Sequence, residues 1–182
     1  MRYFNIAGPC NKIDHYMIDA SERLHGVEEL IDYKQYFVIH AARQSGKTTY
    51  LQDLSSRLNS GGKYYCLYSS LEELQGVIDP KDGIPQIVRT LIKDFTYSGI
   101  PGASDFGKDA DFIDFSNVLG VELTKICIKL DRPLIILFDE ADCLSEGTMI
   151  TFLRQLRNGH NNRTVRPFVH SVALVGMRNI RD

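Results

Sequence analysis

The sequence predicts an α/β fold in which a parallel β-sheet lies between layers of helices. Segments with strand character alternate with segments of helical periodicity along the 182 residues, as expected for successive βαβ units. Two strand-like segments, residues 36–41 and 134–138, are short apolar runs that lead directly into a glycine-containing turn and an acidic pair. Parallel strands bind ligands at their carboxyl ends, so we expect a functional site at that edge of the sheet.

The composition is that of one globular domain. The chain is 43% hydrophobic and 24% charged, with a formal net charge of −2, so no global basic field attracts nucleic acid. The four cysteines show no metal-binding spacing, and their scatter is typical of reduced thiols. No apolar run approaches the roughly 20 residues that a membrane-spanning helix requires. We expect a soluble cytoplasmic protein, without a membrane or nucleic-acid partner.

The periodicity of the apolar residues places the elements in order. A leading helix is expected to begin near Asp19 and to continue through Ile31. Strands are expected at 36–41, 64–70, 134–138 and 168–175, and the third should be central because it is continuously apolar. Helices are expected at 47–59, at 83–95 with Pro85 in the first turn, at 112–130, and at 145–157 ending at Asn158 and Gly159. Residues 96–111 are rich in Gly, Ser, Pro and Asp and predict a surface loop that is functional or mobile.

The segment after the first strand has the pattern of a phosphate-binding loop. The usual pattern is glycine, four variable residues, then Gly-Lys-Ser/Thr, and here Ala41 replaces the first glycine. Gly46 allows the backbone amides to turn toward a phosphate, and the dipole of the following helix favours an anion. Lys47 is expected to contact the β- and γ-phosphates, and the Thr48 hydroxyl to bind magnesium. The nucleotide-binding set is completed by Ala42, Arg43, Gln44, Ser45 and Thr49.

An ordinary strand-to-helix turn that happens to contain Gly-Lys-Thr is the alternative to a phosphate loop. The apolar strand before the turn and the helix after it are the context that phosphate binding requires. A second motif, about 90 residues later, also favours that reading over the ordinary turn.

Two carboxylates directly follow the third predicted strand in the sequence. Asp139 is expected to hold the magnesium ion, and Glu140 to orient and deprotonate a water molecule that attacks the γ-phosphate. The alternative is that both residues only cap the next helix and occupy its first turn. That alternative accounts well for one carboxylate and less well for two adjacent ones.

The last strand leads into a polar segment that could sense the γ-phosphate. Arg178 or Asn179 is a candidate for this role, Arg178 through direct charge pairing, although polar loop residues are usually only solvated. An arginine from the late basic run could reach a neighbouring subunit's nucleotide, although a solvated face is the default for Arg154, Arg157, Arg163 and Arg166.

The segments AARQSGKTT, LIILFDEAD and VALVGMRN together resemble those of AAA-type and STAND-like P-loop ATPases, and most specifically the bacterial AAA-ATPase-like proteins. The resemblance implies a three-layer P-loop NTPase fold of the additional-strand class. In that fold the phosphate-loop strand is central, and the strand before Gly176 lies between it and the Asp139 strand. It also implies ATP rather than GTP as the nucleotide, with Mg2+. Arg178 at a strand end is more typical of the STAND-like branch.

The same resemblance divides the chain into a leading segment at 1–35, near the adenine, and a nucleotide-binding sheet at 36–182. Relatives continue into a helical lid, which residues 1–182 do not contain. A homo-oligomer or a protein partner is compatible with this class.

The expected function is therefore ATP binding and Mg2+-dependent hydrolysis to ADP. Three alternatives remain open. A STAND-like regulatory switch would bind nucleotide with little turnover. A phosphotransferase is less favoured, because Glu140 directly after Asp139 suits activation of water. A nucleic-acid motor has no basic and aromatic cluster to support it.

Overall fold

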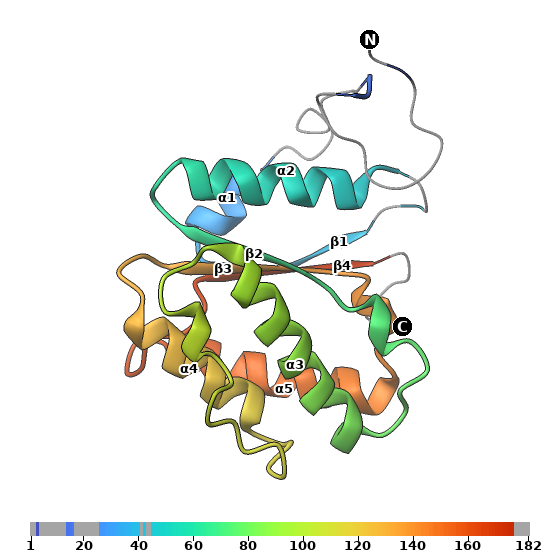
Figure 1. Cartoon of the computed structure of the whole chain (residues 1–182), viewed down its shortest axis with the longest axis vertical. Coiled ribbons are helices and arrows are strands. Elements are labelled where there is room, and N and C mark those ends of the chain that lie inside the picture. Colours follow the sequence, from blue (N-terminus) through green and yellow to red (C-terminus); the bar gives the residue numbers. More distant parts are fainter. Residues whose placement is uncertain (1–2, 4–13, 17–25, 41, 43–44, 177–182) are drawn as a thin grey trace.

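The computed structural model describes residues 3, 14–16, 26–40, 42 and 45–176. Within them, one sheet contains the parallel strands β1 (Tyr36–His40), β2 (Tyr65–Ser70), β3 (Leu134–Asp139) and β4 (Ser171–Gly176). Helices α1 (Val27–Asp32) and α2 (Lys47–Ser60) cover one face of the sheet. Helices α3 (Pro80–Ser98), α4 (Val118–Lys129) and α5 (Glu146–Asn161) cover the other face (Figure 1). This three-layer α/β architecture confirms the predicted fold class.

The strand order is β1-β4-β3-β2, so β4 lies between β1 and β3 as the resemblance implied. The expectation of a central phosphate-loop strand is wrong for the described residues, because β1 pairs there with β4 alone and forms an edge of the sheet. The strands are parallel, so their carboxyl ends meet at one edge, where His40 lies opposite Gly176 and Ser70 opposite Asp139. This edge contains the sequence motifs.

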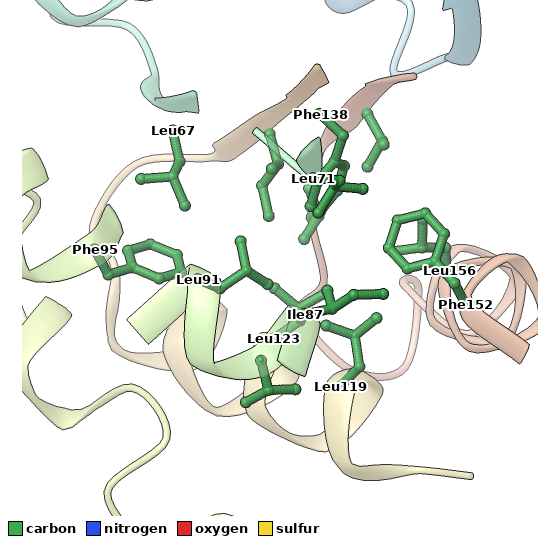
Figure 2. Close-up of a cluster of buried hydrophobic side chains, with 14 of the residues drawn as sticks. Leu67, Leu71, Ile87, Leu91, Phe95, Leu119, Leu123, Phe138, Phe152 and Leu156 are labelled. Carbon is green, nitrogen blue, oxygen red and sulfur yellow. The ribbon is translucent and has the colours of Figure 1, made fainter. Parts of the chain in front are cut away.

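Two hydrophobic cores fill the spaces between the layers. The larger core packs β2, β3 and β4 against α3, α4 and α5; Figure 2 shows Ile87 and Leu91 of α3 among Leu119, Leu123, Phe138 and Phe152. The smaller core lies under α1 and α2. Side chains of β3 alternate between the two cores, and all six residues of the strand are buried. The alternation places Asp139 on the α2 face, after Ile135 and Leu137.

The leading helix is shorter than expected. Gly26 has a φ of +88°, outside helical geometry, so α1 begins at Val27 and does not extend continuously from Asp19. Residues 17–25 of the expected helix lie outside the described residues.

Helix α5 continues to Asn161, so the expected stop at Asn158 and Gly159 is wrong. Gly159 instead permits close packing: a Cβ atom there would lie 2.2 Å from Cζ of Phe168. Phe168 therefore packs on α5 before the strand starts, and β4 begins at Ser171 rather than at residue 168.

Helix α3 is longer than the helix predicted at residues 83–95. It begins at Pro80, where Asp79 accepts a 2.8 Å hydrogen bond from the N–H of Lys81, so Pro85 lies inside the helix and not in its first turn. Helix α4 begins at Val118 instead of near residue 112. The preceding residues form turns in which the Asp114 carboxylate accepts hydrogen bonds from the side chains of Ser116 and Asn117.

The expected loop at residues 96–111 is a packed segment. Helix α3 extends to Ser98, a short 3-10 helix, η3 (Ala103–Asp105), follows, and Ile100 and Phe106 are buried in the larger core. The buried Glu122 carboxylate of α4 accepts a 2.9 Å hydrogen bond from the N–H of Gly107 and contacts Nζ of Lys125 at 2.6 Å. Glu122 thus fixes the segment to α4. Among the described residues, no helix is both long and apolar enough to cross a membrane.

Removing this carboxylate should destabilise the domain. Glu122→Ala leaves the Gly107 N–H without its acceptor, and we expect it to lower the free energy of unfolding by about 1–3 kcal/mol. Glu122→Gln should cost less, because the amide oxygen can still accept from Gly107. Urea unfolding measures both effects, with Glu146→Ala on an exposed helix position as control. Equal stability of the Glu122→Ala and control variants would contradict this role.

Candidate functional site

The structure brings the two sequence motifs into direct contact. The Thr48 hydroxyl, in the first turn of α2, donates a 2.6 Å hydrogen bond to Oδ2 of Asp139, the last residue of β3. The two residues are 91 positions apart in the sequence. The contact forms because β1 and β3 are parallel and α2 starts close to the end of β1.

The turn before α2 has the backbone geometry of an open helix N-terminus. Gly46 occupies the N-cap position with a φ of +85°, a left-handed conformation that a residue with a side chain rarely adopts. The N–H of Ser45 bonds to the carbonyl of Ala42 at 3.3 Å. A glycine cap has no side chain to accept from the first amides of α2, so these amides and the helix dipole favour an anion there.

The remaining loop residues are placed as follows. Lys47 is buried at the start of α2, Thr49 is half-buried, and Ala42 and Ser45 are exposed. Ala41, Arg43 and Gln44 lie outside the described residues.

Asp139 is almost completely buried, with 1% of its surface exposed, and its carboxylate is held by three donors. Oδ2 accepts from Thr48 and from the Tyr68 hydroxyl at 3.1 Å, and Oδ1 accepts from the N–H of Glu140 at 3.0 Å. Burial, together with the negative charge of Asp139, raises the pKa of Tyr68 above its ordinary value, so its hydroxyl keeps its proton and can donate even at alkaline pH. Donors from α2, β2 and the adjacent backbone therefore orient this carboxylate.

Tyr68 was not among the predicted site residues, because residues 64–70 were interpreted only as a strand of aromatic and mostly apolar residues. One signal was present. Tyr68 lies two residues before Ser70, the partner of Asp139, so both side chains point to the α2 face of neighbouring parallel strands.

Glu140 follows Asp139 in a left-handed conformation, with a φ of +53°. Burial raises the pKa of its carboxyl group, the charge of Asp139 raises it further, and Lys47 opposes the shift. The negative charges of Asp142 and of Glu72, which lies just after β2, also raise this pKa; Glu72 was not among the residues predicted for the site. Lys47 and Glu140 are therefore close enough to interact electrostatically.

The structure argues against the alternative that the acidic pair only caps the next helix. The long helix α5 begins at Glu146 with Ser145 at its N-cap. Glu140 precedes only the short 3-10 helix η4 (Ala141–Cys143), and its side chain makes no capping hydrogen bond. Asp142 lies against the end of β4, where a Cβ atom on Gly176 would be 2.5 Å from its Oδ1.

Thr48 and Asp139 supply two oxygen atoms, which suits a magnesium ion shared with phosphates and water. They do not form a metal site built wholly from protein ligands. The described residues contain no group of three or more His, Cys, Asp or Glu side chains able to hold a metal. Mg2+ is commonly held by only one or two protein oxygens together with substrate phosphates and water. A hydroxyl and a carboxylate 2.6 Å apart suit that mode of binding.

The candidate arginines that the structure describes lie away from this cluster or make other contacts. Arg178 and Asn179 lie outside the described residues. Arg154 and Arg157 line a groove of about 750 Å³ beside β1 and α5, on the face of the sheet opposite to α2. The Arg163 guanidinium donates a 2.9 Å hydrogen bond to the carbonyl of Lys34, and Arg166 is exposed.

Comparison with known proteins supports the fold. No family model and no curated protein matches the sequence. A solved structure, a Walker-type ATPase of Pyrococcus abyssi, is similar to 95% of this chain with a TM-score of 0.60 and 17% sequence identity. The chain covers 48% of that protein's length. The similarity shows that the chain has a P-loop NTPase fold.

The left-handed cap of α2 gives a testable consequence. A Cβ atom on Gly46 would meet nothing within 4 Å, so Gly46→Ala should destabilise the domain through backbone strain alone, by about 1 kcal/mol. Gly46→Asn should cost less, because asparagine tolerates this conformation better. Thermal unfolding of the unmodified chain and of the two variants measures the order of their stabilities. A stabilising Gly46→Ala would contradict the observed cap.

Proposed function

We propose that the chain binds ATP with Mg2+ and hydrolyses it to ADP. The observation that carries this proposal is the 2.6 Å hydrogen bond between Thr48 and Asp139 beside the glycine-capped start of α2. It joins an anion-binding helix terminus to a buried carboxylate with metal-binding chemistry. An ordinary strand-to-helix turn would not require this contact.

The phosphates would bind at the start of α2. In this proposal Lys47 contacts the β- and γ-phosphates, and the backbone amide of Gly46 donates to phosphate oxygens, as does that of Ser45 in place of its 3.3 Å hydrogen bond to the carbonyl of Ala42. Thr48 and Asp139 hold Mg2+, which neutralises phosphate charge when bound. The nucleotide-binding set is completed by Ala42, Arg43, Gln44, Thr49 and Asn179.

Glu140 is proposed as the general base. Its carboxylate accepts a proton from the water whose oxygen attacks the γ-phosphorus, and the bond from that phosphorus to the ADP oxygen breaks. The raised pKa of Glu140 supports this role, because a stronger base accepts the proton more readily. Lys47 stabilises negative charge on the γ-phosphate during the transfer.

Several finer points rest on the sequence resemblance. They are the AAA-type or STAND-like subtype, the preference for ATP over GTP, and γ-phosphate sensing by Arg178. A cytoplasmic location and a homo-oligomer or protein partner also belong to the proposal, as does the division into a leading segment at 1–35 and a nucleotide-binding sheet at 36–182.

Lys47→Ala should weaken nucleotide binding. We expect at least a tenfold higher Kd for MgATP, because a buried cation beside the phosphates is lost. Isothermal calorimetry with MgATP, MgADP and MgGTP measures affinity and base selectivity. Lys81→Ala is the matched control, since it removes an exposed lysine from the first turn of a different helix. Equal affinities of the two variants would refute the phosphate site.

Glu140→Gln should bind MgATP normally and lose turnover, by about 100-fold or more, because the amide cannot accept the proton. Steady-state phosphate release measures this loss, with Glu146→Gln as control for the charge change. Unchanged turnover in Glu140→Gln would exclude Glu140 as the base. Tight binding by the unmodified chain with almost no turnover, and with retained ADP, would instead favour the STAND-like switch.

A further inference from the structure

We propose that Tyr68 is a positioning residue for the metal side of the nucleotide site, acting through its hydrogen bond to Asp139. The inference rests on the proposed function and extends it to a strand outside both sequence motifs. Tyr68 lies on β2, and its hydroxyl lies 3.1 Å from Oδ2 of Asp139.

The hydrogen-bond capacity of Asp139 gives the first argument. A carboxylate offers about four lone-pair positions on its two oxygens. Thr48 and Tyr68 use both positions on Oδ2, and the Glu140 N–H uses one on Oδ1. The remaining position on Oδ1 is the place where a metal-bound water can donate to Asp139.

The two hydroxyl groups that donate to Asp139, those of Thr48 and Tyr68, differ in what else they have to contact. The Thr48 hydroxyl can offer a lone pair to Mg2+ while its proton stays on Asp139, so in the proposed site its orientation has to suit both partners. The Tyr68 hydroxyl is carried by a half-buried ring that packs against the smaller core, so it stays directed at Oδ2. Tyr68 therefore orients the carboxylate of Asp139 without itself serving the metal.

Packing alone does not account for the Tyr68 hydroxyl. A phenylalanine ring would fill the same space against the core without placing a polar atom beside a buried carboxylate. Tyr65, on the same strand, shows the contrasting case, because its hydroxyl donates at 2.9 Å to the exposed Asp131, near the opposite end of the sheet. Tyr65 is thus a matched control of the same residue type and the same strand.

The test compares Tyr68→Phe with Tyr65→Phe in the 182-residue chain. Calorimetry measures ATP binding at fixed nucleotide over a series of Mg2+ concentrations and again with EDTA. We expect Tyr68→Phe to raise the Mg2+ concentration for half-maximal binding about tenfold, as for a lost hydrogen bond to a charged group. Binding of ATP in EDTA should be unchanged, and Tyr65→Phe should behave as the unmodified chain.

A double-mutant cycle separates positioning from general structural support. In an Asp139→Ala background, which removes the acceptor of the Tyr68 hydrogen bond, Tyr68→Phe should have no further effect on the Mg2+ dependence, because Tyr68 acts only through Asp139. Equal loss of binding with and without Mg2+ would show a merely structural residue and overturn the inference. An unchanged Mg2+ dependence in Tyr68→Phe would overturn it while leaving the proposed function intact. Failure of the unmodified chain to bind MgATP would refute the proposed function and this inference with it.

Discussion

The structure depends on one constraint, the buried carboxylate of Asp139 at the end of the central strand β3. A carboxylate with 1% exposure is costly unless hydrogen bonds replace its hydration. The donors come from α2, from β2 and from the adjacent backbone, so the charge can be accommodated only when these elements are in place. The same interaction therefore links the helix that follows the glycine turn to the sheet and forms the candidate site.

The topology explains why this link lies at one edge. All neighbouring strands are parallel, and β4 lies between β1 and β3, so the ends of β1, β3 and β2 face the same side. Helices α3, α4 and α5 pack a large core against the opposite face of the sheet, and all six residues of β3 are buried. A strand packed on both faces is a firm support for Asp139, and the proposed hydrolysis would require a preorganised site of this kind.

The sequence predicted the parts that arise from local pattern. Helical and strand periodicity gave the order of elements, and Gly46 followed by Lys47 and Thr48 marked the start of α2. Interactions between distant segments were not predictable in the same way. Pro80 begins α3 because Asp79 caps it, and α5 passes through Gly159 because Phe168 packs there. The contact of Tyr68 with Asp139 was not predictable, because the two residues are 71 positions apart and meet only when β2 and β3 are neighbours in the sheet.

The most direct test of the central claim is a crystal structure of the chain with Mg2+ and a non-hydrolysable ATP analogue. Our account predicts the phosphates at the amides of Ser45 and Gly46, with the cation next to the Thr48 hydroxyl and a metal-bound water within hydrogen-bond distance of Asp139. Phosphates bound away from the start of α2, or a cation that neither lies next to the Thr48 hydroxyl nor carries a water bound to Asp139, would contradict it.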